Sequence, residues 1–221
     1  MCFSATASFL AAAVTGAAGV AALARVGHAR EIPLALIPLA FATQQLVEGA
    51  LWLTLPVAPA GGLSSLLKQA FLIYSLAFWP VFAPFAAWSL ETAPLRRAAT
   101  ALCLALGIAL AAYFATTVLA APHTSCISGG HIVYQVGIKE HLLVGLLYLA
   151  ATGGALAISS HRAVSLLGAI VIAGSVTAYM FYWSVFISVW CFFAAVCSVV
   201  ILLHFERARA ARRADVYAAR V

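Results

Sequence analysis

Apolar residues run without interruption through most of the chain, in stretches about as long as a bilayer is thick. A helix needs roughly 20 mostly apolar residues to cross a membrane. Because the stretches are continuous rather than alternating, and because a lone strand cannot satisfy its backbone in lipid, they predict helices. Seven stretches qualify: Ser8–Val26, Ile32–Leu55, Leu66–Leu90, Ala98–Ala120, Glu140–Ile158, Ala163–Tyr182 and Ser184–Phe205.

The composition supports this interpretation. Of the 221 residues, 65% are apolar and only 8% are charged, and the mean hydropathy is +1.08. A soluble domain carries about 25% charged residues, so soluble, disordered and disulfide-framework proteins are excluded. We predict an all-α, polytopic bundle of seven transmembrane helices in the inner or plasma membrane. This domain would comprise residues 1–205, and a basic cytoplasmic tail would follow at residues 206–221.

The cations are shared unequally between the two predicted faces of the membrane. Ten arginines fall on one side and two lysines on the other. Since Lys and Arg are enriched in cytoplasmic loops, the amino terminus is predicted outside and the carboxyl terminus inside. The net charge of +6 lies mostly in the tail. Anionic lipid headgroups are therefore the expected partner of the tail, and no motif suggests nucleic acid. The arginines are Arg25, Arg30, Arg96, Arg97, Arg162, Arg207, Arg209, Arg212, Arg213 and Arg220, and the lysines are Lys68 and Lys139.

Only one carboxylate lies well inside a predicted span. Glu48 lies seven residues before Leu55, roughly 10 Å below the outer edge at 1.5 Å per residue. Gln44, Gln45 and Trp52 stand at i−4, i−3 and i+4 from it, so all four share one helix face. An ionisable group inside a membrane usually faces the bundle interior and marks a functional site.

Other polar residues gather in the same outer half of the bundle. Cys191 in the seventh span lies at about the depth of Glu48, and the long connector Ala121–Lys139 carries His131 and Tyr134 on the same side. We therefore predict an outward-facing polar pocket, roofed by this connector, that binds a small molecule, a lipid or a metal ion. The predicted ligand-binding residues are Gln44, Gln45, Glu48, Tyr134, Tyr179 and Trp190.

The chemistry of such a pocket has several alternatives, and the sequence leaves open whether the chain is an enzyme. In a catalytic interpretation, Glu48 is the acid or base, His131 is a second proton-transfer group or ligand, and Cys191 is a hydrogen-bonding wall or nucleophile. A metal ion is an alternative cofactor, although the spacing of its ligands matches no standard zinc pattern. The candidate ligands are Cys2, Glu48, His123, Cys126 and His131, and a disulfide between Cys2 and Cys126 is a further alternative.

Two other functions also fit the sequence. A proton-coupled transporter is favoured by Pro80 and Pro84, which interrupt the third span, but no inverted repeat accompanies them. A structural or assembly subunit would use stripes of small residues to bind partner helices. The oligomeric state stays open.

Several segments are similar to those of an uncharacterised family of small bacterial integral membrane proteins with seven helices. The similarity extends over nearly the whole chain except the tail, and it implies no activity, because the family's function is uncharacterised. The sequence segments that resemble the family include the polar residues of the outer half identified above. The segments are Met1-Cys-Phe-Ser-Ala5, Gln44-Gln45-x-x-Glu48-Gly49-x-Leu51-Trp52, Trp79-Pro80, His131-Ile-x-Tyr134 and Ser188-Val-Trp-Cys-Phe-Phe-Ala-Ala195.

Overall fold

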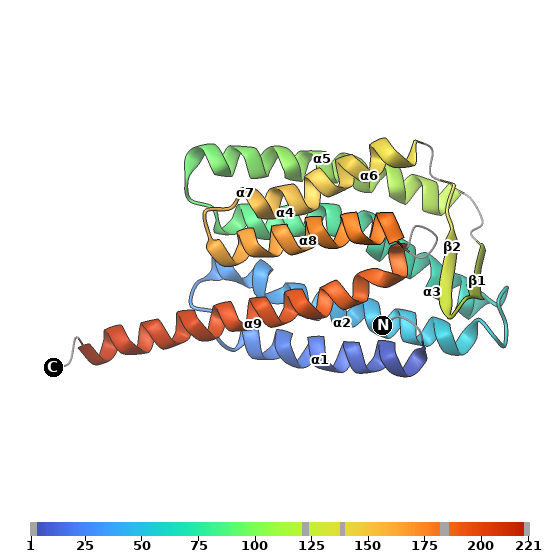
Figure 1. Ribbon diagram of the computed structural model, residues 1–221, viewed down its shortest axis with the longest axis horizontal. Coiled ribbons are helices and arrows are strands. Elements are labelled where there is room, and N and C mark those ends of the chain that lie inside the picture. The colour runs from blue at the N-terminus through green and yellow to red at the C-terminus, as the bar shows by residue number, and fades with distance from the viewer. Residues whose placement is uncertain (1–3, 121–123, 138–139, 182–185, 219–221) are drawn as a thin grey trace.

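The chain folds as a bundle of long helices that run roughly parallel or antiparallel to one another, with a small β-hairpin at one end (Figure 1). A computed structural model describes residues 4–120, 124–137, 140–181 and 186–218. The helices are α1 (Ala5–Leu23), α2 (Ile32–Thr54), α3 (Gly62–Leu72), α4 (Trp79–Leu90), α5 (Pro94–Ala120), α6 (His141–Leu149), α7 (Ala155–Ile158), α8 (Arg162–Phe181) and α9 (Phe186–Ala218).

Two pairs of these helices are continuous, so the described residues form seven helical rods in all. A π-helical turn, Ile73–Phe78, joins α3 to α4, and a second one, Ala150–Gly154, joins α6 to α7. Five of the rods are long and apolar enough to cross a membrane. The chain is therefore a helical bundle of membrane-protein character, as predicted. These five rods are Ala5–Leu23, Ala29–Thr54, Gly62–Leu90, Pro94–Ala120 and His141–Ile158.

The ends of the helices differ from the predicted spans where local chemistry intervenes. The first helix begins earlier than predicted, at Ala5, because the Ser4 hydroxyl accepts a hydrogen bond from the Ala7 amide at 3.1 Å and caps the helix. The last helix has 33 residues and continues past Phe205 to Ala218. At 1.5 Å per residue it is about 50 Å long. Most of the predicted tail is thus a direct extension of α9, which projects beyond the bundle (Figure 1).

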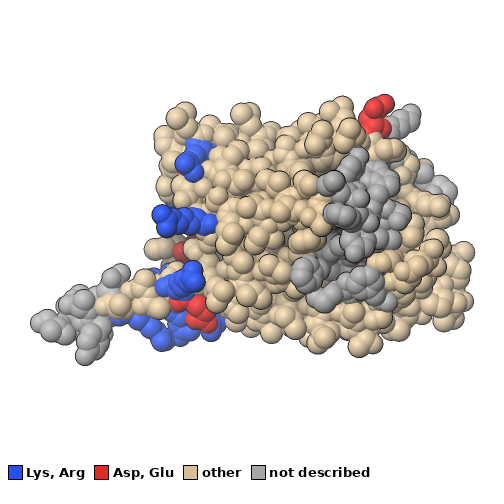
Figure 2. All heavy atoms as spheres, viewed as in Figure 1, with Lys and Arg blue, Asp and Glu red and all other residues tan. Residues whose placement is uncertain are grey.

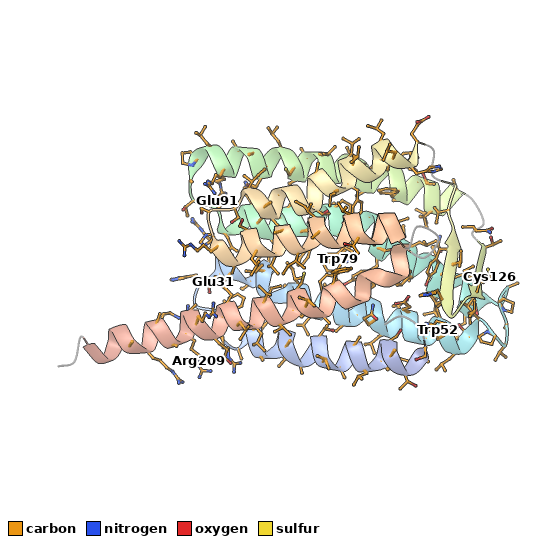
Figure 3. All side chains as sticks on the ribbon, viewed as in Figure 1. Glu31, Trp52, Trp79, Glu91, Cys126 and Arg209 are labelled. Carbon is orange, nitrogen blue, oxygen red and sulfur yellow. The ribbon has the colours of Figure 1, made fainter. Side chains whose placement is uncertain are left out.

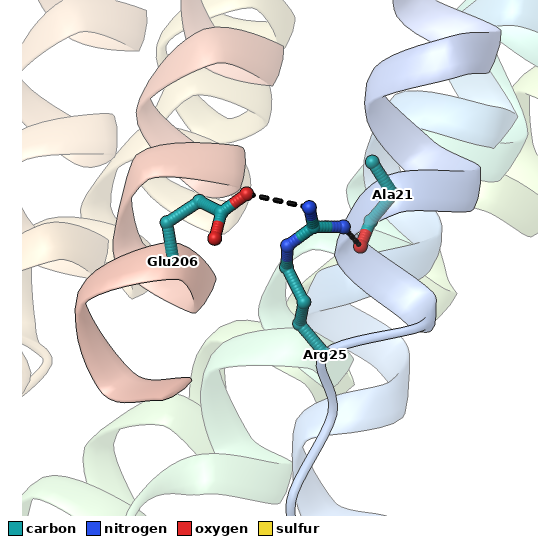
Figure 4. A network of polar contacts seen from close by, with 3 residues as sticks. All are labelled: Ala21, Arg25 and Glu206. Atoms are coloured by element: carbon teal, nitrogen blue, oxygen red, sulfur yellow. Dashed lines mark hydrogen bonds and ion pairs between the residues drawn. The ribbon is translucent and has the colours of Figure 1, made fainter. Parts of the chain in front are cut away.

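The extension of α9 is attached to the end of α1 by arginine contacts. The Arg25 guanidinium forms an ion pair with Glu206 at 2.6 Å and donates a hydrogen bond to the Ala21 carbonyl at 2.6 Å (Figure 4). Arg212 in turn donates to the Arg25 carbonyl at 2.6 Å. These contacts hold the arginine-rich half of α9 against the bundle. Figure 2 shows that the visible Lys and Arg side chains gather at this end of the molecule.

The prolines of the third predicted span lie beside a π-helical turn. Pro80 has no backbone N–H, so it cannot donate to the Leu76 carbonyl one turn earlier, and Leu76 lies within the π-helical turn. The Tyr148 hydroxyl donates a hydrogen bond to the Ser75 carbonyl of the same turn at 2.7 Å. Tyr148 lies two residues before the second π-helical turn, Ala150–Gly154, so this bond connects the two helical rods close to both of their irregular turns.

A close contact between α4 and α5 depends on a glycine. Pro84, like Pro80, lacks an N–H, so the Pro80 carbonyl has no helical hydrogen-bond donor at i+4. The backbone of α5 approaches this carbonyl at Gly107, where a methyl group would overlap the oxygen and lie 2.6 Å from the carbonyl carbon. Only glycine allows this approach.

The connector after α5 contains a β-hairpin, which the prediction of an all-α bundle did not include. Strands β1 (Thr124–Ser128) and β2 (His131–Gln135) pair antiparallel, with Ser125 opposite Tyr134 and Ile127 opposite Ile132. Gly129 and Gly130 form the two-residue turn with φ of +57° and +76°. Two adjacent positive φ values are typical of a type I′ turn, which matches the twist of a hairpin. The prediction missed the hairpin because its strands are only five residues long.

Candidate functional site

Glu48 faces the interior of the bundle rather than lipid. Its side chain is 0% exposed, and Gln44 and Gln45 on the same face of α2 are 5% and 2% exposed. The Gln45 amide donates a hydrogen bond to Glu48 Oε2 at 3.4 Å, and Gln44 Oε1 accepts one from Trp79 Nε1 at 2.7 Å. The helix face predicted from the sequence is therefore buried and links α2 to α4.

The hairpin covers this end of α2 and α3. Because successive side chains of a strand point to opposite faces, Ile132 and Tyr134 both point toward the bundle. Ile132 is 1% exposed and packs in an apolar cluster with Leu51, and the Tyr134 ring stacks on Phe71 with their centroids 4.8 Å apart. The hairpin of this connector therefore packs over the end of the bundle, and its inward face is largely apolar.

Tyr134 lies close enough to Glu48 for the carboxylate to affect the pKa of the phenol. Burial raises the pKa of Tyr134 well above its usual value, and the negative charge of Glu48 raises it further. The phenol therefore remains protonated and keeps its hydrogen-bond donor. Of the residues predicted to meet at the site, the structure brings Glu48, Gln45 and Tyr134 together.

His131 and Cys126 lie on the other face of the hairpin. His131 is three positions from Tyr134, so strand alternation places the two side chains on opposite faces. Cys126 is an exposed free thiol on β1, and burial lowers the pKa of His131. On this face the Thr124 hydroxyl donates to the Gln135 side chain at 2.7 Å. The spacing His131-Ile-x-Tyr134 therefore does not place both residues beside Glu48.

Five buried polar atoms at the hairpin end have no hydrogen-bond partner within the described residues. They come from α1, α2, α3 and both strands of the hairpin. Buried polar atoms are paired in the great majority of cases, and each exception needs an explanation. We call the group formed by these residues and Glu48 the hairpin-end polar cluster, and Figure 3 shows Trp52 at this end of the molecule. The five atoms are Ser8 Oγ, Trp52 Nε1, Ser64 Oγ, Ser125 Oγ and Tyr134 Oη.

The sequence singled out only part of this cluster. Glu48, Trp52 and Tyr134 were recognised from helix spacing and from their place in the outer half. Ser64 and Ser125 were not among the predicted ligand-binding, catalytic or metal-binding residues, because a serine in a connector or at the start of a helix carries no distinctive signal. Their participation depends on the hairpin folding back over α3, which joins positions about 60 residues apart.

The remaining predicted site residues fall outside what is described. Cys2 and His123 lie outside the described residues, and so do the side chains of Tyr179, Trp190 and Cys191. Among the residues that the structure describes, no three His, Cys, Asp or Glu side chains lie together in an arrangement that could hold a metal ion. Of the predicted metal ligands, Glu48 lies in the buried cluster and Cys126 on the outer face of the hairpin.

A second buried carboxylate, missed by the sequence analysis, lies at the opposite end of the bundle. Glu91 follows α4, is 0% exposed, and accepts hydrogen bonds of 2.8 Å from both the amide and the hydroxyl of Ser160. Burial raises the pKa of Glu91, but the hydrogen bonds from Ser160 and Ala93 and the charge of His161 outweigh it and hold the pKa at about 2. The carboxylate is thus ionised and well paired. It connects the α4–α5 and α7–α8 turns, which is a structural role (Figure 3).

Comparison with known proteins identifies a family but no function. A family model described as "Family of unknown function (DUF6629)" matches residues 1–216, which is nearly the whole chain. No curated protein and no solved structure matches the chain.

Proposed function

The chain belongs to this family of unknown function, and we propose that it is a seven-span membrane protein that binds a small molecule at its hairpin end. The observation that carries the proposal is the hairpin-end polar cluster. Ser64 Oγ and Tyr134 Oη are buried without a hydrogen-bond partner, and Tyr134 lies near Glu48, which is 0% exposed. Leaving such a group unpaired costs about 1–3 kcal/mol. A binding site explains why several polar groups at the same end of the bundle are kept at this cost.

The distribution of charge supports a definite orientation for this protein. The described arginines lie at the end of the bundle opposite the hairpin, around the turns after α1, α4 and α7 and along the end of α9 (Figure 2). The positive-inside rule places that end in the cytoplasm. The hairpin and the polar cluster would then face the outside of the plasma membrane, which makes the site accessible to molecules from that side.

Thiol labelling tests this orientation. Cys126 is exposed on the hairpin, whereas Cys197 is 3% exposed in the interior. A membrane-impermeant maleimide added to intact cells should label the wild-type protein at Cys126. The Cys126→Ser variant, which keeps the other cysteines, is the matched control and should lose that label. Labelling of Cys126 only after the cells are broken would reverse the proposed orientation.

Native mass spectrometry tests the site itself. The protein, extracted in mild detergent, should carry a bound small molecule, and Trp52→Phe should reduce the bound fraction because it deletes one unpaired donor while keeping an aromatic ring. Trp88→Phe is the control, since Trp88 lies at the opposite end against Arg97, whose guanidinium is 4.1 Å from the Trp88 ring. Equal occupancy in the two variants, or no bound molecule in the wild type, would contradict the proposed function.

A further inference from the structure

We propose that the first turn of α3, at the hairpin end of the bundle, binds a phosphate group. The inference rests on the proposed function, because Ser64 of this turn belongs to the hairpin-end polar cluster and the inference names a ligand class for that part of the site. It concerns binding alone. Three properties of the turn support it: a buried cation, the uncapped end of a helix and an unpaired hydroxyl.

The buried cation is Lys68, which shares one face of α3 with Ser64. The two residues are four positions apart and are 8% and 1% exposed. Because the Cα–Cβ bonds of a helix lean toward its amino terminus, the Lys68 side chain runs back past Ser64, and its Nζ donates a hydrogen bond to the Pro59 carbonyl at 3.1 Å. Pro59 precedes the helix by three residues. A carbonyl is a neutral partner, so this bond fixes the place of the positive charge beside the first turn without neutralising it.

The end of the helix adds to this positive charge. The free amides at the start of a helix form the positive end of its macrodipole. The N-cap residue is Gly61, no side-chain cap is formed within the described residues, and the first turn holds no acidic residue. The chain has no Asp or Glu at all between Glu48 and Glu91. A cation beside the positive end of a helix is an unfavourable arrangement, which a bound anion makes favourable.

The first turn also offers hydrogen-bond donors and an open side. Ser64 Oγ is buried without a hydrogen-bond partner within the described residues, and a hydroxyl can donate to a phosphate oxygen. Backbone amides at a helix start and a lysine ammonium are common phosphate ligands. Gly62 is exposed, and a methyl group placed on it would meet nothing within 4 Å. An anion can therefore approach the turn from the Gly62 side, with Ser64 and Lys68 on its inner side.

The buried acid Glu48 lies too far along the bundle to oppose such an anion. Phe71 of α3 packs in one cluster with Leu51 of α2, so the two helices are level there. Ser64 lies seven residues before Phe71, about 10 Å nearer the hairpin end, whereas Glu48 lies three residues deeper than Leu51, about 5 Å in the other direction. Because the interaction of two charges falls with distance, Lys68, one turn from Ser64, outweighs Glu48 at this place.

The surroundings of the turn favour a phosphate that is carried by a lipid. In the proposed orientation this end of the bundle lies at the outer surface of the membrane. Leu63 and Leu66 on the same helix are 61% and 62% exposed, and in a membrane such side chains contact acyl chains. A phospholipid holds its phosphate directly above its acyl chains, so one molecule satisfies both the charge and the apolar surface. Free phosphate satisfies the charge alone.

Photo-crosslinking of the full-length protein in detergent tests the inference at the site itself. The probes are phosphatidylglycerol with a photoactivatable acyl chain, diacylglycerol with the same chain but no phosphate, and inorganic phosphate as a competitor. The phosphatidylglycerol probe should label the start of α3 more strongly than diacylglycerol does. Because hydrogen bonds to charged groups are strong, Lys68→Met should weaken its apparent affinity about tenfold or more, and Lys68→Arg should retain it.

Ser64→Ala supplies a milder deletion if Lys68→Met does not fold, and it should also weaken labelling of α3 by phosphatidylglycerol. Ser65→Ala is the matched control, because Ser65 is the exposed neighbour on the same turn. Displacement of the probe by inorganic phosphate, in a manner that depends on Lys68, would show that the site takes free phosphate and would support the phosphate chemistry. Absence of displacement would support a lipid as its source.

The outcomes separate this inference from the proposed function. If diacylglycerol labels α3 as strongly as phosphatidylglycerol does, or if Lys68→Met and Ser64→Ala are labelled like wild type, the inference is overturned. A bound molecule that depends on Trp52 but not on Ser64 or Lys68 would then leave the proposed function standing. If neither lipid labels α3 and native mass spectrometry finds no bound molecule, both proposals fail.

Discussion

Removing the hydroxyl of Tyr134 should make the ligand-free protein more stable. Tyr134 Oη is buried without a hydrogen-bond partner, while its ring stacks on Phe71 at 4.8 Å. Tyr134→Phe keeps the stacked ring and deletes only the unpaired group. Since burying an unpaired polar group costs about 1–3 kcal/mol, the variant should gain up to that amount. At about 2–4 °C per kcal/mol for a chain of this size, the expected increase in melting temperature is several degrees.

The same substitution at Tyr148 is the matched control and should have the opposite sign. The Tyr148 hydroxyl donates to the Ser75 carbonyl at 2.7 Å, in the π-helical turn of the neighbouring rod. Tyr148→Phe therefore removes a formed hydrogen bond and deprives the Ser75 carbonyl of a hydrogen-bond donor. The expected loss is about 1–3 kcal/mol. Both substitutions delete one hydroxyl and keep the ring, so the sign of the change reports whether that hydroxyl had a partner.

The assay is thermal unfolding of both variants in detergent, after repeated detergent exchange has removed bound small molecules. Addition of a ligand that hydrogen-bonds Tyr134 should reverse the order, because wild type then gains a bond that the phenylalanine variant lacks. If Tyr134→Phe in the ligand-free protein is destabilised as much as Tyr148→Phe, the Tyr134 hydroxyl is already bonded inside the protein. The argument for a binding site at the hairpin end would then lose its main support.

Three further predictions test other parts of the structure by thermal unfolding. Gly107→Ala should lower stability by about 1–3 kcal/mol, because the new methyl group meets the Pro80 carbonyl, whereas Gly145→Ala, which meets nothing within 4 Å, should be neutral or stabilising. Glu91→Gln should destabilise the protein near neutral pH, because an amide cannot accept both hydrogen bonds from Ser160; equal stability of the variant would show that this tie is unimportant. Folding lowers the pKa of Glu91 from 4.5 to about 2. The contribution of Glu91 to folding stability is therefore complete above pH 4.5 and is lost as the pH falls through about 2. Acidification over that window should destabilise wild type more than Glu91→Gln.

Much of the architecture follows from local features of the chain. Each predicted span corresponds to a helical rod in the described residues, because a long apolar run has no other way to satisfy its backbone in lipid. The burial of Glu48 followed from the same principle, since a lone acid inside a span is excluded from the lipid face. The predicted helix ends were less accurate in two places. Ser4 caps α1 and so starts it earlier than predicted, and α9 continues beyond the predicted end of its span.

The hairpin shows why the candidate site was only partly predictable. Its two strands are too short for periodicity to reveal, and its register decides which side chains reach Glu48. A single residue of difference in register reverses the face on which each side chain lies. The sequence analysis grouped His131 with Tyr134, but the pairing of Ser125 with Tyr134 turns these two toward the bundle and His131 away from it.

The amino-acid sequence by itself determined the membrane character, the helical rods and the inward position of Glu48, because these depend on hydrophobicity and spacing within about 20 residues. Only the tertiary structure decided that Tyr134 lies near Glu48, that the hydroxyls of Ser64 and Ser125 are buried at the same end of the bundle, and that Glu91 is hydrogen-bonded to Ser160. These contacts join residues far apart in the chain. Their formation depends on how whole helices pack and how a hairpin folds back, which no local pattern records.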